Sequence, residues 1–172
     1  MVVADPEANA TEMVRLSALA SGAGAQVVVF PELSITGYTA GDLFFSLSTL
    51  IQGAEKALLR LLRETAPLPT VIAVGLPVAR DGRLFNVAAL CQEGRLLGLV
   101  PKTFVPNYKE YYEERWFSSA RDAVSDEAMV AGQRVPSAPT SSSRSRTPPR
   151  WCSPPRCART SGRPSPLRAI TR

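Results

Sequence analysis

Two stretches of the chain place apolar residues at helical spacing. The first begins at Asp5-Pro6-Glu7, where an acid can cap the helix and proline takes the first helical position, and Gly22 and Gly24 follow its end. Its apolar face consists of Ala10, Met13, Leu16 and Ala20. The second begins after Asp42, which can cap it, and ends before Pro67 and Pro69. Its apolar face consists of Leu43, Leu47, Leu50, Ile51, Ala54, Leu58, Leu61 and Leu62.

Four other stretches have the pattern of β-strands. They are residues 26–30, 71–75, 84–91 and 96–100. The first two are short apolar runs, which predicts strands that are buried. The Glu93-Gly94 turn joins the last two in a hairpin, and Asp81-Gly82 forms another turn before them. The class is therefore α/β, and because no strand precedes the first helix, we expect residues 1–4 to be the stump of a lost strand.

From Pro136 the composition changes and no apolar periodicity remains. Residues 136–172 hold eight Pro, eight Ser and eight Arg, with no Lys and no acidic residue. Such a segment buries too little apolar surface to offset the entropy of ordering it. We predict a domain at residues 1–135 and a disordered tail at residues 136–172. An Arg/Ser-rich arm for nucleic acid is an alternative interpretation.

The net charge of +5 comes from that tail. Residues 1–135 hold 12 basic and 15 acidic side chains, a net charge of −3, which gives no sign of a nucleic-acid surface. The chain has no run of about 18 apolar residues and does not begin like a signal peptide. We therefore predict a cytoplasmic protein without a membrane span.

The chain has no histidine, which excludes Ser-His-Asp and Cys-His catalysis and His-ligated metals. Its three cysteines, Cys91, Cys152 and Cys157, form neither a metal-site spacing nor a disulfide framework. No metal site and no cofactor site is predicted.

Two charged residues stand where a predicted strand gives way to a loop. Glu32 follows Pro31 at the end of the first strand, and Lys102 follows the hairpin 70 residues later. In α/β sheets, ligand-binding and catalytic residues are commonly found at the carboxyl ends of strands. The two side chains could form a plain ion pair, or a general base beside a charge that stabilises an oxyanion. Sequence spacing alone does not decide between the ion pair and the catalytic pair. It also allows Glu32 to be an ordinary surface residue.

The amino-acid sequences of two segments resemble signatures of a known family. FPELSITGY, at residues 30–38, and GRLLGLVPKTFVPNY, at residues 94–108, resemble two signatures of the nitrilase, or carbon–nitrogen hydrolase, superfamily. GYTAGDLFF, DGRLFNVAALCQEGRLLG and the pattern KxxxPNYxxxxExRxF are most similar to the glutaminase domain of glutamine-dependent NAD synthetases. The resemblance covers residues 2–135 and implies a partial αββα sandwich, an amide substrate such as glutamine, and association into a homo-oligomer.

The resemblance also implies roles for four residues. Glu32 would be the general base that takes the proton of a cysteine thiol, and Lys102 would stabilise the tetrahedral oxyanion. Tyr108 matches a loop tyrosine that contacts glutamine, and Glu113 matches an acid that helps hold the lysine and orient the substrate. The alternatives are ring packing for Tyr108 and a solvated helix charge for Glu113.

The third motif of the family, which reads CEDxW and carries the nucleophile, is absent. Cys157 lies at about the expected distance but within PPRCARTSG, Cys152 shares the tail, and Cys91 is predicted to pack in the core. If the coding DNA is translated in the frame that starts one base upstream, codons 137–144 can encode FGTDLLFE. In the same frame, codons 157–162 can encode VCEDVW. We hypothesise that the tail is a frameshift product and that the chain is a poorly soluble, inactive fragment.

Two other functions stay open. The chain could derive from another nitrilase-superfamily member, such as an aliphatic amidase or carbamoyl hydrolase, although the PNYxxxxE loop argues against it. It could also be a non-catalytic protein whose basic tail binds RNA or phosphates.

Overall fold

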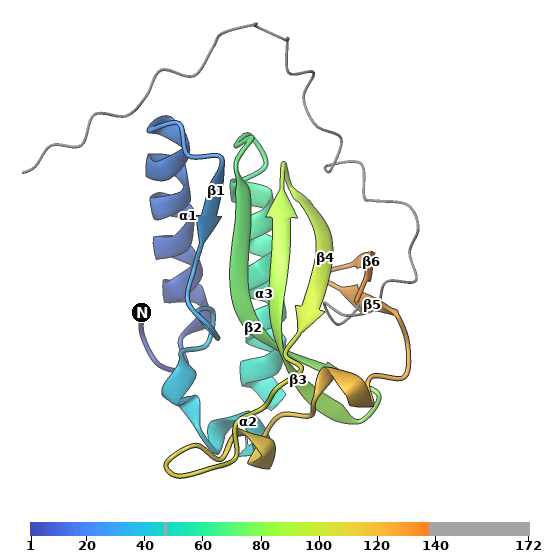
Figure 1. Ribbon diagram of the computed structural model, residues 1–172. Helices are drawn as coiled ribbons and strands as arrows, with labels where there is room; N and C mark the ends of the chain where they lie inside the picture. Colours follow the sequence, from blue (N-terminus) through green and yellow to red (C-terminus); the bar gives the residue numbers. More distant parts are fainter. Residues whose placement is uncertain (47, 138–172) are drawn as a thin grey trace, which may run out of the picture. The chain divides into compact units, whose positions relative to one another are not determined.

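The computed structural model describes residues 1–46 and 48–137. Its main sheet has the strand order β1-β2-β3-β4, with β1 parallel to β2 and the other pairs antiparallel (Figure 1). The strands are β1 (Val27–Val29), β2 (Val71–Arg80), β3 (Arg83–Gln92) and β4 (Arg95–Pro101). The mixture of helices and a sheet confirms the predicted α/β class.

Both predicted helices are present. Helix α1 spans Pro6–Gly22, and the Asp5 side chain caps it by accepting a hydrogen bond from Ala8 N at 3.0 Å. The second prediction corresponds to two helices, α2 (Leu43–Ser46) and α3 (Ser48–Glu64). Helices α1 and α3 pack against each other, and α3 also packs against β2 (Figure 1).

The predicted apolar face of α1 is partly wrong. Leu16 is 39% exposed, whereas the polar residues Asn9 and Ser17 are buried beside Ala10 and Met13. Asn9 is buried because its side-chain amide bonds the backbone: it accepts from Val2 N at 2.7 Å and donates to the carbonyl oxygens of Val2 and Ile35. Asn9 thereby holds Val2, and residues 1–4 contain no strand, so the expected loss of a preceding strand stays a prediction.

Two tight hairpins join β2, β3 and β4. Asp81 and Gly82 have φ angles of 50° and 70°, and Glu93 and Gly94 have φ angles of 49° and 75°. Positive φ at both central residues is the type I′ geometry, which matches the twist of the flanking strands. The hairpin predicted at Glu93-Gly94 is confirmed.

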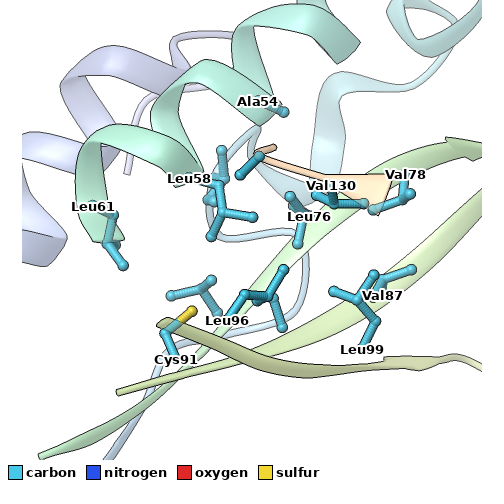
Figure 2. Packing of buried hydrophobic residues seen from close by; sticks show 14 of the residues in the cluster. Ala54, Leu58, Leu61, Leu76, Val78, Val87, Cys91, Leu96, Leu99 and Val130 are labelled. Atoms are coloured by element: carbon cyan, nitrogen blue, oxygen red, sulfur yellow. The ribbon is translucent and has the colours of Figure 1, made fainter. Parts of the chain in front are cut away.

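The core lies on the face of the sheet that packs against α3. Figure 2 shows Leu58 and Leu61 of α3 above side chains of β2, β3 and β4. Strands β2 and β3 contribute alternate residues, because successive side chains point to opposite faces. The sheet residues labelled in the figure are Leu76, Val78, Val87, Cys91, Leu96 and Leu99.

The prediction that the first strand is buried is wrong. Val27 is 58% exposed and Val29 is 73% exposed, while Val28 is half-buried. Strand β1 is the edge of the sheet, and Val27 and Val29 lie on the face opposite the core, where they remain in contact with solvent. The apolar run thus predicted the strand correctly. It could not show whether other elements cover both faces of that strand or only one.

A further hairpin, β5 (Glu127–Val130) and β6 (Gln133–Pro136), was not predicted from the sequence. Its strands have four residues each, and its turn at Ala131-Gly132 lacks the usual Asn or Asp signal, although both φ angles are positive. Strand β6 packs against β4, and Val130 and Val135 enter the core.

Ordered structure continues slightly past the predicted domain boundary at residue 135. Pro136 belongs to β6, and the buried Ser137 forms a parallel bridge with Leu99. The predictions for residues 138–172, among them the disorder of the tail and the positions of Cys152 and Cys157, fall outside the described residues.

Candidate functional site

Glu32 is placed by a loop that crosses directly over β2. The loop leaves β1 at Phe30 and runs over Gly75, where an added Cβ would lie 2.3 Å from Leu33 N and 2.9 Å from Glu32 C. The same glycine accepts a hydrogen bond from Ile35 N at 3.0 Å and donates to Ser34 Oγ at 3.1 Å. Because only glycine leaves room for this crossing, Gly75 fixes where the Glu32 carboxylate lies.

Lys102 meets that carboxylate from the other edge of the sheet. It directly follows β4, and its Nζ lies 2.7 Å from Glu32 Oε1. The backbone N–H of Lys102 donates to the carbonyl oxygen of Asn86 on β3 at 2.8 Å, which continues the pairing of the two strands. The loop over β2 and the end of β4 therefore bring together two charges that lie 70 residues apart in the sequence.

Glu113 is the second carboxylate on Lys102. It begins a short 3₁₀ helix, Glu113–Arg115, and its Oε2 accepts a hydrogen bond from Lys102 Nζ at 2.8 Å. Its side chain is only 4% exposed, unlike the solvated charge that the alternative interpretation expects. The Tyr38 hydroxyl donates to its other oxygen at 2.5 Å. Two carboxylates therefore share one ammonium group, and the inner carboxylate has a second donor.

The network shifts the titration of two of its members. Burial of Lys102 acts to lower its pKa, but the hydrogen bonds to Glu113 and Glu32 outweigh burial and hold that pKa above its ordinary value. Burial, with the bond to Glu113, raises the pKa of Tyr38. Both shifts keep protons on the donors, so Lys102 remains a cation and Tyr38 a neutral hydroxyl at neutral pH.

The site opens into a cavity of about 770 Å³ on the face of the sheet opposite the core. Glu32, Asn86 and Lys102 line it, together with apolar residues of the four strands and with Phe104 and Arg121. This volume lies within the range of small-molecule sites, which combine apolar walls with a few polar groups. The polar groups here are a carboxylate, an amide and an ammonium.

Tyr108 lies apart from this cluster. Its side chain is 63% exposed, its ring packs against Tyr111 with centroids 5.9 Å apart, and it does not line the cavity. The ring packing that was its alternative interpretation is therefore present, and a contact with substrate stays a prediction.

Two residues of the cluster were not picked out from the sequence. Asn86 donates from Nδ2 to Glu32 Oε1 at 2.6 Å, and Tyr38 bonds Glu113 as described above. Asn86 does leave a signal, because it is the polar residue in the middle of the apolar stretch at residues 84–91. Tyr38 ends the FPELSITGY segment, but its spacing to Glu113 carries no sequence signal.

Cys91 cannot supply a nucleophile to this site. It is buried on the core face of β3, whereas Asn86 of the same strand lies on the cavity face. Burial raises the pKa of its thiol to about 12, so the reactive thiolate does not form at neutral pH. The predicted core packing of Cys91 is confirmed (Figure 2).

Across residues 1–46 and 48–137, no group of three His, Cys, Asp or Glu side chains is arranged to hold a metal ion. The helices within the same residues are all too short or too polar to cross a membrane.

This arrangement suits one kind of chemistry in particular. The partly exposed Glu32 carboxylate can accept a proton from a group in the cavity, and the fixed ammonium of Lys102 can stabilise negative charge that develops beside it. Glu113, held by Tyr38, keeps Lys102 in place. The cluster therefore has the parts of an acid–base site with an electropositive centre.

Comparison with known proteins places these residues in a family. The sequence profile described as carbon–nitrogen hydrolase matches residues 1–143. The glutamine-dependent NAD(+) synthetase of Mycobacterium tuberculosis is 38% identical over 113 residues, which is 66% of this chain and 16% of that protein. The synthetase of the same name from Mycobacterium leprae is 32% identical over 120 residues, 70% of this chain and 18% of that protein. The chain therefore spans less than a fifth of the length of these relatives.

Solved structures agree in fold. A glutamine-dependent NAD(+) synthetase from Cytophaga hutchinsonii superposes with a TM-score of 0.72 and 24% identity, over 80% of this chain and 23% of that one. A nitrilase-superfamily amidase from Nesterenkonia gives a TM-score of 0.57 and 20% identity, over 77% of this chain and 49% of that one. These likenesses confirm the expected nitrilase-type fold.

Proposed function

The chain belongs to the carbon–nitrogen hydrolase family, and on that premise we propose that its cavity is the base-and-lysine half of an amide-hydrolysing site. The observation that carries the proposal is the Lys102 ammonium, fixed between the Glu32 and Glu113 carboxylates at 2.7 and 2.8 Å. A structural ion pair needs no cavity, but this one lines a cavity of about 770 Å³.

Each residue of the cluster has a distinct proposed role. Glu32 takes the proton of an attacking thiol, which becomes the nucleophilic thiolate. The thiolate attacks the amide carbonyl, and Lys102 stabilises the oxyanion of the tetrahedral intermediate that forms. Glu113 holds Lys102 and helps orient the substrate, and Tyr108 contacts the substrate from the loop.

The proposed substrate is glutamine, from which the complete site would release ammonia through a thioester. Support comes from the relatives named glutamine-dependent NAD(+) synthetase, which match at up to 38% identity. Because this chain spans only 16% to 18% of those relatives, synthesis of NAD itself is not proposed for it.

We further propose that the chain as it stands lacks the nucleophile, because its codons from 136 onward are read in the wrong frame. The missing CEDxW motif supports this, as does the unsuitable position of Cys91. The nucleotide sequence across codon 136 tests it. The proposal fails if the frame one base upstream contains a stop codon or does not encode VCEDVW over codons 157–162.

An activity assay tests the same proposal on the protein. We expect no ammonia release from glutamine above the buffer rate. Glutamine hydrolysis that survives Cys157→Ala but is lost in Glu32→Ala would show that a nucleophile is present elsewhere, and would contradict the proposal.

The substrate is tested with the re-read chain, defined as this chain translated one base upstream from codon 136. It should release ammonia from glutamine faster than from aliphatic amides or N-carbamoyl amino acids. A preference for either of the latter would instead support an aliphatic amidase or a carbamoyl hydrolase.

A further inference from the structure

The two donors that reach Glu32 share one of its oxygens. Asn86 Nδ2 lies 2.6 Å and Lys102 Nζ 2.7 Å from Oε1. Among the described residues, none donates a hydrogen bond to Oε2. The Glu32 side chain is 42% exposed and lines the cavity, which leaves room for a proton donor beside it.

We propose that Asn86 is a positioning residue that selects which oxygen of Glu32 accepts the proton. With Lys102 it occupies Oε1 and leaves Oε2 as the basic atom that faces the cavity. The inference rests on the proposed role of Glu32 as a general base and adds a role for Asn86, to which the resemblance assigned none.

Asn86 is built into the sheet at the point where it can do this. Its side chain is buried on the cavity face, while its neighbours Phe85 and Val87 belong to the core on the other face. Its carbonyl oxygen also accepts from Lys102 N at 2.8 Å. A single strand residue therefore holds the base through its side chain and the lysine through its backbone.

The chemistry of the two donors decides the site of protonation. An ammonium group donates only, and the Nδ2 end of an asparagine amide also donates only, so neither can accept a proton that arrives on Oε1. Protonating Oε1 would break at least one bond to an ionised carboxylate, which is among the stronger hydrogen bonds in proteins. Protonating Oε2 forms the new O–H bond and leaves both hydrogen bonds at Oε1 in place.

The same geometry fixes the direction of the carboxylate. Lys102 alone would set the direction of the carboxylate less sharply, because an ammonium group can turn its three donors toward either carboxylate oxygen. A buried asparagine on a strand is short and held by packing, so its donor marks one position for Oε1. Oε2 then points into the cavity, where a thiol could reach it.

Side-chain amide NMR of the whole chain tests the proposal. The chain has three asparagines, Asn9, Asn86 and Asn107, which makes their side-chain signals readily assignable. Asn107 is the matched control, because it also donates to a glutamate, Glu114, at 2.9 Å, but in an exposed position. One Asn86 Nδ2 proton should lie downfield of those of Asn107 and exchange with solvent at least about tenfold more slowly.

Two variants separate positioning from packing. In Glu32→Gln the carboxylate charge is removed, so the Asn86 signal should move upfield and exchange faster while Asn107 is unchanged. In Lys102→Met the Asn86 signal should stay, since its own bond to Oε1 remains. An Asn86 signal that is indifferent to Glu32→Gln in a folded chain would overturn the proposal, and so would a wild-type spectrum without the dispersion of a folded protein.

The result is independent of the test of the proposed function. If the Asn86 signature is present but the re-read chain hydrolyses no amide, the proposed function fails and the positioning of Glu32 stands. If the re-read chain hydrolyses glutamine but the signature is absent, only the role of Asn86 is overturned.

Discussion

The two faces of the main sheet are built from alternate residues of the same strands, yet they differ in almost every property. On β3, Val87 and Cys91 belong to the core cluster with α3, while Asn86 lies on the opposite face and bonds Glu32. The core face is apolar and buried, whereas the cavity face carries Lys102 between two carboxylates and leaves Val29 exposed. We therefore expect substitutions on the core face to change stability, and substitutions on the cavity face to change the proposed activity.

The largest loss of stability is expected on the core face. Leu58 is fully buried in α3, so Leu58→Ala should lower the free energy of unfolding by about 2–5 kcal/mol through lost burial and the cavity left behind. Val29→Ala is the control on the other face, where the side chain is 73% exposed and a change within about 0.5 kcal/mol is expected. Urea unfolding measures both, and equal losses would remove the distinction between the faces.

Gly75→Ala should affect both the stability of the chain and the position of the Glu32 loop. Its new Cβ would meet backbone atoms of the Glu32 loop at 2.3 to 2.9 Å, so the loop must move. We expect a loss of about 1–3 kcal/mol, typical of overpacking, together with a changed environment of Lys102.

The control for Gly75→Ala is Gly53→Ala in α3. There a Cβ meets only Pro6 Cγ, at 3.5 Å, and alanine favours the helix, so unfolding should become slightly harder. NMR of isotope-methylated lysines, three in this chain, reports on Lys102. A Gly75→Ala chain with an unchanged Lys102 signal would contradict the account of the loop.

Lys102→Met should cost about 1–3 kcal/mol, because it leaves the buried Glu113 carboxylate without its cation. In a Glu113→Gln background the same change should cost less, since no buried carboxylate is then stranded. A double-mutant cycle measured by urea unfolding gives the coupling. If the changes in the free energy of unfolding are strictly additive, the Glu113 carboxylate is not stabilised by Lys102, contrary to this expectation.

The contribution of Lys102 should also depend on pH. Its pKa is higher in the folded chain than its ordinary value of 10.5, so the stabilisation is fully present below pH 10.5 and is lost as the pH rises through the folded pKa. The stability difference between wild type and Lys102→Met should therefore be constant near neutral pH and shrink in strong alkali. A difference that grows above pH 10.5 would contradict the assigned direction of the shift.

The smallest effect is expected at Cys91. Because its thiol is buried and has a pKa of about 12, it should remain unmodified by iodoacetamide in the folded chain at neutral pH and react once the chain is unfolded. Mass spectrometry of the peptide that contains Cys91 measures this. Rapid modification in the folded chain would place Cys91 in reach of solvent.

Local pattern was enough to predict the helices and the Glu93-Gly94 hairpin, because capping residues and turn glycines act on their neighbours in sequence. It failed for the exposure of Val29, which depends on what covers the sheet, and for β5 and β6, whose four-residue strands carry too little periodicity. At the site, Glu32, Lys102 and Glu113 were predicted because they lie in segments that resemble family motifs. The bonds from Asn86 and Tyr38 could not be predicted, because they depend on contacts between residues 54 and 75 positions apart.

We propose that the cavity face is an amide-hydrolysing site, with Glu32 as its base and Lys102 as the cation that stabilises the oxyanion. The most direct measurement is the rate of ammonia release from glutamine by the re-read chain and its variants. Glu32→Gln and Lys102→Met should each lower that rate by about 10²–10⁴-fold, whereas Glu127→Gln, an exposed change on β5, should leave it unaltered. Full activity in Glu32→Gln would contradict the claim.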